Sequence, residues 1–434
     1  MRSCLKEKIE FKGYETTTVN GAKVVALIKG DDTVDSLQAG DEGEVVLDQT
    51  PFYAESGGQV GDAGSLVAPG VEFSVTDTQK IKADVFGHHG AVVSGQVSVG
   101  DAVRTQVDTA RRASTMRHHS ATHLMHKALR QVLGGHVQQK GSLVDPGKTR
   151  FDFAHNAPLT DDEIRRVEEL VNAEIIDNHA TSARVMPIDE AQKLGAMMLF
   201  GEKYGDEVRV LDIGSSRELC GGTHVQRTGD IGVFKIVAES GVAAGVRRIE
   251  ALTGLNAVAW AQQQRGALHN LVSALHVSDE QALDAIEKLQ AEAKKLAREV
   301  SQLKTKLAMA GGGSDKAGYD IVDAGGLKLA RAKTAGLDKD AVRAMADSMK
   351  AAITSGVVLV TTTGDEGKVS IVVSVTPDLV KTIAAGKLVK ELAPIVGGGG
   401  GGRPDFAEAG GKDASRIDEL HAQAPEVLAR LLGR

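Results

Sequence analysis

Cysteine is almost absent from this chain of 434 residues, which contains only Cys4 and Cys220. Two cysteines cannot form the disulfide framework of a small secreted protein, nor a zinc ribbon held by four cysteines. So low a cysteine content is typical of proteins in the reducing cytosol. We therefore expect a cytoplasmic protein whose parts depend on hydrophobic cores.

Aromatic residues and long apolar runs are scarce as well. Aromatic residues make up 3% of the chain, with Trp260 as the single tryptophan, so a surface on which single-stranded bases stack is not expected. No apolar run approaches the roughly 20 residues that cross a membrane. The segment that follows Met1 also lacks the apolar stretch of a signal peptide. The sequence therefore predicts no membrane partner.

An excess of basic residues is missing too, because the formal net charge is −7. This total argues mildly against nucleic acid as a partner, but it hides an uneven distribution. Between Arg104 and Arg150 there are nine Lys and Arg residues against two acids, Asp108 and Asp145. The block fits either a surface for an anionic substrate or a solvated helix face, and charge alone favours neither.

Two short motifs place potential metal ligands four residues apart. The first is His119-Ser-Ala-Thr-His123 and the second is Cys220-Gly-Gly-Thr-His224. Positions i and i+4 lie on one face of a helix, and glycines let a loop close tightly around an ion. Three imidazoles and one thiolate suit tetrahedral Zn²⁺. Because no Glu follows His119, the first motif is not that of a zinc peptidase.

The length of the chain and its changing pattern predict a multidomain α+β protein. We expect a small β-barrel at 1–106, an α/β domain with the proposed zinc ligands at 107–255, an antiparallel helical arm at 256–310 and an α/β C-terminal domain at 311–434. Within the barrel, the glycine-rich segment Glu55–Asp62 is only weak evidence for a phosphate-binding loop, because no Gly-Lys-Ser/Thr follows it.

Helix signals place the first ligand motif. A long helix should run from about Asp108 to Leu133 and end at Gly134. A second helix should follow a capping box formed by Thr160 and Glu163. The first ligand pair therefore belongs to a helix and the second to a loop, and the fold must bring them together.

The arm carries a heptad seam that steps by alternating threes and fours. Its members are Ala282, Ile286, Leu289, Ala293, Leu296, Val300, Leu303 and Leu307. The seam can pair with a second copy of the chain or fold back on the preceding helix, Val258 to Leu275. Ala310–Ser314 then reads as a flexible joint.

The C-terminal domain shows strong strand patterns at 356–363 and 368–375 and amphipathic helices at about 338–353, 378–395 and 414–432. Six glycines, 397–402, precede Arg403. Because the run lies between two helices that should both pack, we expect a loop held close to a neighbouring group rather than a linker.

Several motifs together give the chain a resemblance to a known family. They include Tyr53-Ala-Glu-Ser-Gly-Gly-Gln-Val-Gly-Asp62, Gln139-Lys-Gly-Ser-Leu143, Leu199-Phe-Gly-Glu-Lys-Tyr-Gly-Asp206, Gly245-Val-Arg-Arg-Ile249 and Arg403-Pro-Asp405, besides the two ligand motifs. With them the chain resembles the C-terminal half of a bacterial-type alanyl-tRNA synthetase. The unbroken glycine run departs from the family pattern, in which a Lys or Arg usually interrupts it.

The resemblance implies a β-barrel, a zinc-bearing editing domain, a coiled-coil arm and a C-terminal domain for tRNA binding or oligomerisation. It implies no aminoacylation core, since we find no ATP-binding signature, and it favours a fragment of a longer synthetase over a free-standing editing protein. The implied activity is an aminoacyl-tRNA deacylase that hydrolyses Ser-tRNA(Ala) and Gly-tRNA(Ala). The implied partners are this mischarged tRNA and, through the arm or the C-terminal domain, a second copy.

The resemblance also implies roles for individual residues. Gln139, Thr122 and Cys220 are the candidate catalytic residues, and Arg247 and Arg403 are candidates for binding the substrate. His119, His123, Cys220 and His224 are the zinc ligands. The alternative is a non-catalytic tRNA-binding and oligomerisation module with a structural zinc. A phosphoesterase is disfavoured, because the Asp-His-His core of such enzymes is missing.

Other histidines are expected to be bystanders. We expect His118 to be solvated and the pair His88 and His89 to lie on the surface. His126 continues the ligand face of the helix and is a less favoured replacement for one ligand.

Overall fold

The computed structural model describes residues 9–82, 85–198, 205–310, 318–364 and 367–433. The chain divides into two compact units, Met1–His269 and Asn270–Arg434. No helix among the described residues is long and apolar enough to cross a membrane. Cys4 and most of the expected motif at 199–206 lie outside the described residues.

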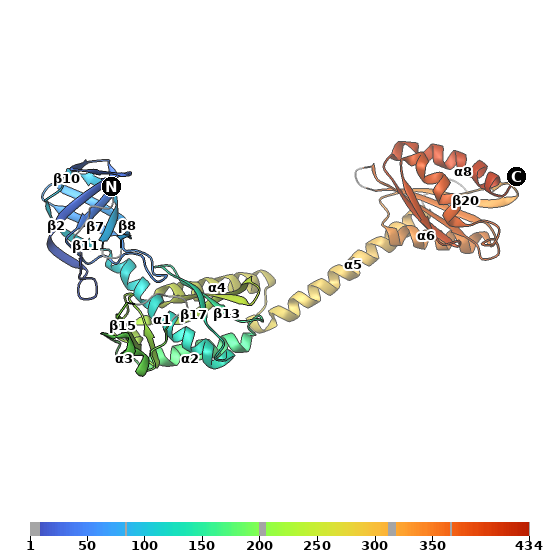
Figure 1. Cartoon of the computed structure of the whole chain (residues 1–434). Coiled ribbons are helices and arrows are strands. Elements are labelled where there is room, and N and C mark those ends of the chain that lie inside the picture. The colour runs from blue at the N-terminus through green and yellow to red at the C-terminus, as the bar shows by residue number, and fades with distance from the viewer. Residues whose placement is uncertain (1–8, 83–84, 199–204, 311–317, 365–366, 434) are drawn as a thin grey trace. The chain divides into compact units, whose positions relative to one another are not determined.

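The first unit begins with the expected barrel, seen in blue in Figure 1. Six strands form a closed antiparallel ring, because β11 pairs with both β7 and β2. In spatial order they are β2 (Thr18–Lys29), β5 (Glu42–Leu47), β9 (Val85–Ser94), β8 (Val71–Lys82), β7 (Gly64–Ala68) and β11 (Ala102–Val107). Alternate apolar residues of these strands fill the interior, as a small barrel requires.

Short strands flank the ring. β3 (Asp32–Val34) pairs with one end of β2. Two further pairs are formed by β1 (Glu10–Phe11) with β6 (Gln49–Thr50) and by β4 (Ser36–Gln38) with β10 (Gln96–Ser98).

The α/β part of the first unit is built on a four-stranded antiparallel sheet. Its spatial order is β12 (Gln139–Val144), β13 (Thr149–Ala154), β18 (Val246–Thr253) and β17 (Phe234–Ala243). Helices α1 (Thr109–Leu133) and α2 (Asp161–Ile176) pack on it over a shared apolar core. The predicted helix ends are confirmed, because Asp108 caps α1, Gly134 ends it, and Thr160 and Glu163 form the capping box of α2.

A second, three-stranded sheet carries the cysteine motif at its end. It consists of β14 (Ser182–Pro187), β15 (Glu207–Ile213) and β16 (Ser216–Leu219), with α3 (Ile188–Lys193) packed beside it. Cys220 follows β16 directly, and the 3-10 turn η2 (Thr228–Ile231) leads from this motif into β17. The ligand loop therefore begins at the end of a strand that contacts α1.

Two long helices occupy the segment expected to be an arm, α4 (Gly254–Leu275) and α5 (Ala282–Ala310), separated by η3 (Asp279–Gln281). The seam side chains Ile286, Leu289, Leu296, Val300 and Leu303 are all exposed. The antiparallel packing of this seam is therefore not confirmed, and the side chain of Leu307 lies outside the described ones.

The second unit contains one six-stranded sheet. Its spatial order is β19 (Asp320–Ala324), β20 (Leu327–Ala335), β21 (Val357–Thr363), β22 (Val369–Val375), β24 (Phe406–Gly411) and β23 (Gly399–Gly402). Only the β20–β21 pair is parallel. Helices α6 (Lys339–Ile353), α7 (Ala385–Leu392) and α8 (Ile417–Leu431) pack on it, with the turns η5 (Ala393–Val396) and η6 (Ala414–Arg416) beside them.

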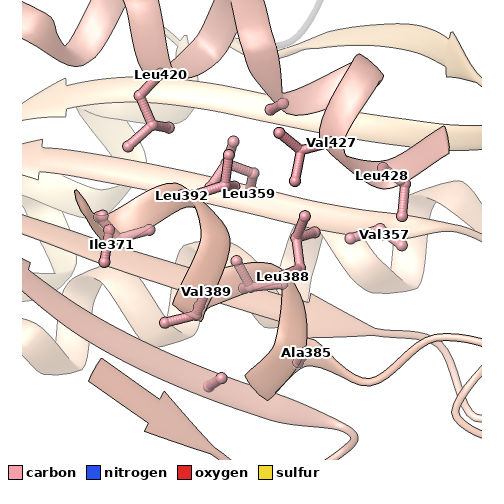
Figure 2. Packing of buried hydrophobic residues seen from close by; sticks show 14 of the residues in the cluster. Val357, Leu359, Ile371, Ala385, Leu388, Val389, Leu392, Leu420, Val427 and Leu428 are labelled. Atoms are coloured by element: carbon pink, nitrogen blue, oxygen red, sulfur yellow. The ribbon is translucent and has the colours of Figure 1, made fainter. Parts of the chain in front are cut away.

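Alternation along β21 divides the core of the second unit between the two faces of the sheet. Val357 and Leu359 pack with α7 and α8, whereas Val358 and Val360 pack with α6. Figure 2 shows the first of these layers, with α7 and α8 side chains against Val357 and Leu359. A strand buried on both faces reads as a continuous apolar run, which is why the sequence identified it readily.

The glycine run departs from expectation. Gly399–Gly402 is not a loop but β23, an edge strand paired with β24. A Cβ atom on Gly400 would lie 2.2 Å from the carbonyl oxygen of Glu408. The close approach of the two strands therefore explains glycine at this position.

His88 also departs from expectation, because it is fully buried in the barrel and not on the surface. Its ring nitrogens contact Thr50 Oγ1 at 2.7 Å and the carbonyl oxygen of Val45 at 2.8 Å. Burial lowers the pKa of His88 to about 4. His89 is only partly buried, so the expected surface position is wrong mainly for His88.

We expect this buried imidazole to make the barrel less stable in mild acid. Between pH 6.5 and 4 the unfolded chain binds a proton at His88 that the folded barrel does not, so stability falls as the pH is lowered through this window. The slope from one such group is up to about 1.4 kcal/mol per pH unit. Hydrogen exchange of β5 and β9 amides at pH 7 and 5 measures it. His88→Gln should reduce the slope, the exposed control His179→Gln should keep it, and equal slopes in all three proteins would contradict the assignment.

Candidate metal centre

The helix that carries the first ligand pair is fixed to the barrel by a buried ion pair. Arg112, in the first turns of α1, contacts both carboxylate oxygens of Asp62. It also donates to the carbonyl oxygens of Gly13 at 2.9 Å and Pro51 at 2.8 Å. The exposed fractions of the Arg112 and Asp62 side chains are 3% and 6%. The start of α1 is therefore held in place by three separate stretches of the barrel.

The four predicted ligands converge. One ligand atom from each of His119, His123, Cys220 and His224 lies within 4.8 Å of the others. Cys220 Sγ is 3.5 Å from His119 Nε2 and 3.2 Å from His224 Nε2. The helix pair and the loop pair, about 100 residues apart in the sequence, thus form one cluster.

The other nitrogen of each ligand imidazole has a polar partner. His119 Nδ1 lies 2.8 Å from Gln59 Oε1, and His123 Nδ1 lies 2.8 Å from Glu218 Oε2. His224 Nδ1 lies 3.3 Å from Ser120 Oγ. Such partners fix the ring orientation and leave Nε2 as the metal-facing nitrogen.

Gln59 determines the tautomer of His119. Gln59 Oε1 accepts from the backbone N–H of Thr223 at 2.9 Å, and its Nε2 donates to Thr223 Oγ1 at 2.9 Å. Because Oε1 is an acceptor, the proton of neutral His119 must lie on Nδ1. The side chain of Gln59 is fully buried. Gly222 leaves room for this arrangement, because a Cβ atom there would lie 2.2 Å from the His119 ring.

The donor set fits a zinc ion. His123 Nε2 is buried and has no hydrogen-bond partner among the described residues, and an orphan of this kind requires an explanation. Three imidazole nitrogens and one sulfur are the usual donors of a tetrahedral zinc site. His119, His123, Cys220 and His224 would therefore hold the ion.

Electrostatics prepare the thiol for this role. Burial opposes ionisation of Cys220, but the surrounding histidines, His119 foremost, outweigh it and hold the pKa of the thiol well below its usual value. Burial lowers the pKa of His224 to about 3. Burial also disfavours charge on His123, yet the Glu218 carboxylate raises the pKa of His123 to about 10. Metal binding at His123 would therefore compete with a proton.

Three members of the cluster, His119, His123 and Cys220, lie in the wall of a cavity of about 410 Å³. One side of the cavity comes from the α/β part and includes Gln139 and Thr122, and the other comes from the barrel and includes Tyr14 and Tyr53. The Tyr14 hydroxyl donates to the carbonyl oxygen of Gly221, in the ligand loop. The site therefore belongs to both parts of the first unit, and its volume suits a small organic group.

Comparison with protein families finds three matches along the chain. Residues 2–111 match the family described as tRNA synthetases class II (A), and residues 208–250 match the threonyl and alanyl tRNA synthetase second additional domain. Residues 326–430 match the DHHA1 domain.

Whole-sequence relatives agree with these matches. The alanine–tRNA ligase of Bordetella bronchiseptica is 55% identical over 94% of this chain and 46% of its own length. That of Methylobacillus flagellatus is 56% identical over 98% of this chain and 47% of its own length. The chain belongs to the alanyl-tRNA synthetase family. It spans about half the length of the relatives that it matches.

A solved structure also matches part of this synthetase-family chain. The C-Ala domain from Aquifex aeolicus alanyl-tRNA synthetase is 24% identical, covering 25% of this chain and 98% of that chain with a TM-score of 0.24. A TM-score this low does not establish a shared fold.

The match at 2–111 modifies the expected relation to the synthetase family. The resemblance alone implies only segments that follow the aminoacylation core. Because the class II (A) model matches the barrel and the start of α1, this region of the chain lies within the synthetase model itself.

The structure places all three residues for which the synthetase resemblance implied catalytic roles, Gln139, Thr122 and Cys220, in the cavity wall. Gln139 is the first residue of β12, and its side chain makes no hydrogen bond within the described part of the chain. Both the carbonyl oxygen and the NH2 group of its amide therefore remain available. Thr122 differs, because its hydroxyl donates to the carbonyl oxygen of His118 at 2.8 Å and lies 2.6 Å from Thr149 Oγ1. Its one proton is thus committed, and only its methyl group and a lone pair remain for a ligand.

The two arginines proposed for substrate binding lie outside this cluster. Arg247 forms a two-pronged ion pair with Glu239, at 2.6 Å for both contacts, and does not line the cavity. Arg403 is 77% exposed in the second unit and lies 3.3 Å from Asp405. Neither observation tests their roles, which stay predictions.

His118 corrects another expectation, because it is fully buried and not solvated. Its Nδ1 lies 2.8 Å from the carbonyl oxygen of Asp145, and its Nε2 accepts from the Thr253 backbone N–H at 3.2 Å. It therefore joins α1 to β18. The basic block is likewise partly internal, since Arg112 is buried and Lys148 pairs with Glu250.

The sequence did not single out four residues that contact the candidate ligands or the ligand loop, namely Gln59, Glu218, Ser120 and Tyr14. Gln59 lies in a glycine-rich segment that is only weak evidence for a phosphate-binding loop, and Ser120 and Glu218 lie near the predicted ligands His119 and Cys220. The available signal was Gln59 itself, a polar residue inside a glycine-rich segment that lacks the phosphate-binding lysine.

We expect Gln59→Ala to lower zinc affinity about 10- to 100-fold, because it removes the group that orients His119. Competition with a chromophoric chelator measures the affinity. Gln38→Ala, the same exchange at an exposed barrel position, serves as the control. Equal affinities for the two variants would contradict the proposed support of His119.

Proposed function

We propose that the chain is the editing and tRNA-binding portion of an alanine–tRNA ligase, acting in the cytoplasm on Ser-tRNA(Ala) and Gly-tRNA(Ala). It hydrolyses the ester between the wrong amino acid and the tRNA, and it does not carry out aminoacylation by itself. The observation that carries the proposal is the cluster of three histidines and one cysteine, of which His119, His123 and Cys220 line a cavity shared by the barrel and the α/β part.

The need for such a site follows from the limits of binding. A pocket built for alanine cannot strongly reject glycine, which is smaller, and rejects serine only weakly, because one hydroxyl is a small difference. A second site that hydrolyses the errors supplies the missing discrimination.

The donor set favours a positioning role for zinc. Because four protein ligands would leave no position open for an activated water, the ion would position groups around the ester or support the structure, and it would not activate water. Gln139 offers a free donor and a free acceptor to the aminoacyl group. Cys220 contributes as a ligand, and Thr122 contributes to the shape of the cavity.

Charged groups at the cavity suit a tRNA end. Lys80 of the barrel, exposed and 2.9 Å from Ser56 Oγ, and Arg209 both line it. Arg209 also lies over the Tyr14 ring at 4.1 Å, which holds its guanidinium in place. In the second unit, Arg403 provides an exposed cation for another part of the same tRNA. The exposed seam of α5 supports pairing with a second copy.

One assay tests this function. The purified chain is incubated with tRNA(Ala) carrying serine, glycine or alanine, and loss of the ester is followed. We expect turnover of the seryl and glycyl esters and little of the alanyl ester. Tight binding without turnover of any ester would instead support a non-catalytic tRNA-binding module with a structural zinc.

A further inference from the structure

One more histidine lines the cavity without any assigned role. His126 lies on α1, one helical turn beyond His123, and its side chain is 2% exposed. It lines the same cavity as Gln139 and Phe151, with its ring centroid 5.0 Å from that of Phe151. It is not a member of the four-residue ligand cluster.

Neither ring nitrogen of His126 has a hydrogen-bond partner among the described residues. More than about 90% of buried polar groups in proteins are hydrogen-bonded, so this imidazole is an exception. Two other buried histidines of the same unit, His88 and His118, have partners for both nitrogens. The fold thus pairs these structural histidines and leaves His126 available in the cavity wall.

Glu218 orients the His126 ring electrostatically. Its Oε1 lies 3.7 Å from His126 Nδ1, which is too long for a hydrogen bond but close enough to favour the proton on that nitrogen. The carboxylate is itself fixed, because Oε2 contacts His123 Nδ1 at 2.8 Å and Oε1 accepts from Ser216 Oγ at 2.8 Å. Neutral His126 is therefore left with Nε2 as a hydrogen-bond acceptor.

We propose that His126 determines specificity by accepting, at Nε2, a hydrogen bond from the side-chain hydroxyl of a seryl group bound in the cavity. The proposal rests on the proposed function, which places an aminoacyl ester in this cavity. A neutral hydroxyl suits the position better than the substrate ammonium group. Both Glu218 oxygens already have partners, and Phe151 makes the surroundings apolar.

The hydroxyl also distinguishes the two substrates. Serine carries it and glycine does not, so loss of the acceptor should affect the seryl ester alone. A site built to hydrogen-bond a hydroxyl loses affinity for it when the partner is removed, because a buried polar group is left unpaired. With the glycyl ester, the space of the missing side chain leaves room for a water beside His126.

The test compares kcat/KM for seryl and glycyl tRNA(Ala) in three proteins. We expect His126→Phe to lower hydrolysis of the seryl ester about 10- to 100-fold and to change that of the glycyl ester by less than about 3-fold. His126→Gln, whose amide carries an acceptor at a similar distance, should restore part of the seryl rate. His179→Phe, the same exchange at an exposed histidine, should leave both rates unchanged.

Several outcomes would overturn the proposal. Seryl and glycyl rates that fall together, or a lower zinc content, would make His126 a structural support. Unchanged rates in His126→Phe would mean that its nitrogens meet only trapped water. If His126→Phe does not fold, the test is the ratio of seryl to glycyl rates in His126→Gln. A ratio equal to that of the wild type would contradict recognition of the seryl hydroxyl by His126. If the wild-type chain hydrolyses neither ester, the proposed function fails first and the His126 assignment with it.

Discussion

Cys220→Ala is expected to remove the metal and to lower hydrolysis of the seryl ester by more than about 100-fold. Loss of a group that only supports a metal ligand costs up to about 100-fold, and loss of a ligand itself should cost more. The thiolate is the only sulfur donor in the cluster and lies within hydrogen-bonding distance of two ligand imidazoles. The exchange removes a single heavy atom beside two glycines, so the packing should change little. Metal analysis and the ester assay measure the two effects, and circular dichroism measures folding.

The other cysteine provides a matched control. Cys4→Ala makes the same exchange outside the two ligand motifs of the sequence and should keep metal content and activity. A Cys220→Ala protein that retains its metal would contradict the ligand assignment. Wholesale unfolding would show that the metal is structural and would remove the best support for its part in hydrolysis.

Arg112→Met is expected to destabilise the first unit by about 3–5 kcal/mol, because it leaves the Asp62 carboxylate buried without its partner. Arg112 also holds the carbonyl oxygens of Gly13 and Pro51, so the barrel should separate more easily from α1. Since Gly13 precedes Tyr14, which contacts the ligand loop, ester hydrolysis should fall as well. Thermal unfolding followed by hydrogen exchange in α1 and β7 measures the change.

A surface pair and a double variant make this prediction specific. Arg416→Met breaks an exposed i,i+3 pair with Glu419, which should be worth less than about 1 kcal/mol. Arg112→Met combined with Asp62→Leu removes both buried charges and should recover much of the lost stability. Equal destabilisation by Arg112→Met and Arg416→Met would show that the buried pair does not anchor α1.

Local signals in the sequence predicted the elements that carry the ligands. The N-caps of α1 and α2 are side chains that accept hydrogen bonds from backbone N–H groups in the first turn of the helix. They therefore depend on a few neighbouring residues only. The pairs His119–His123 and Cys220–His224 likewise follow from local spacing. That the pairs share one metal was inferred from the chemistry of four donors, and the geometry of the cluster agrees with it.

The contribution of the barrel depends on contacts between distant parts of the chain and was not predicted. Gln59 lies 60 residues from His119, and nothing in its neighbourhood shows that its amide turns toward an imidazole. The same reason explains the wrong expectation for His118. The periodicity of the helix does not show whether His118 faces the core or the solvent. Its contacts with Asp145 and Thr253, which are distant in the sequence, bury it. The glycine strand β23 was missed because strand pairing there depends on β24 and not on side-chain pattern.

Whether His119, His123, Cys220 and His224 hold one ion together decides most of what is proposed for the cavity. X-ray absorption at the zinc edge of the purified chain measures it directly. We predict about one zinc per chain with one sulfur at about 2.3 Å and three nitrogens at about 2.0–2.1 Å. A spectrum without sulfur in the coordination sphere, or one that is unchanged in Cys220→Ala, would contradict the metal centre described here.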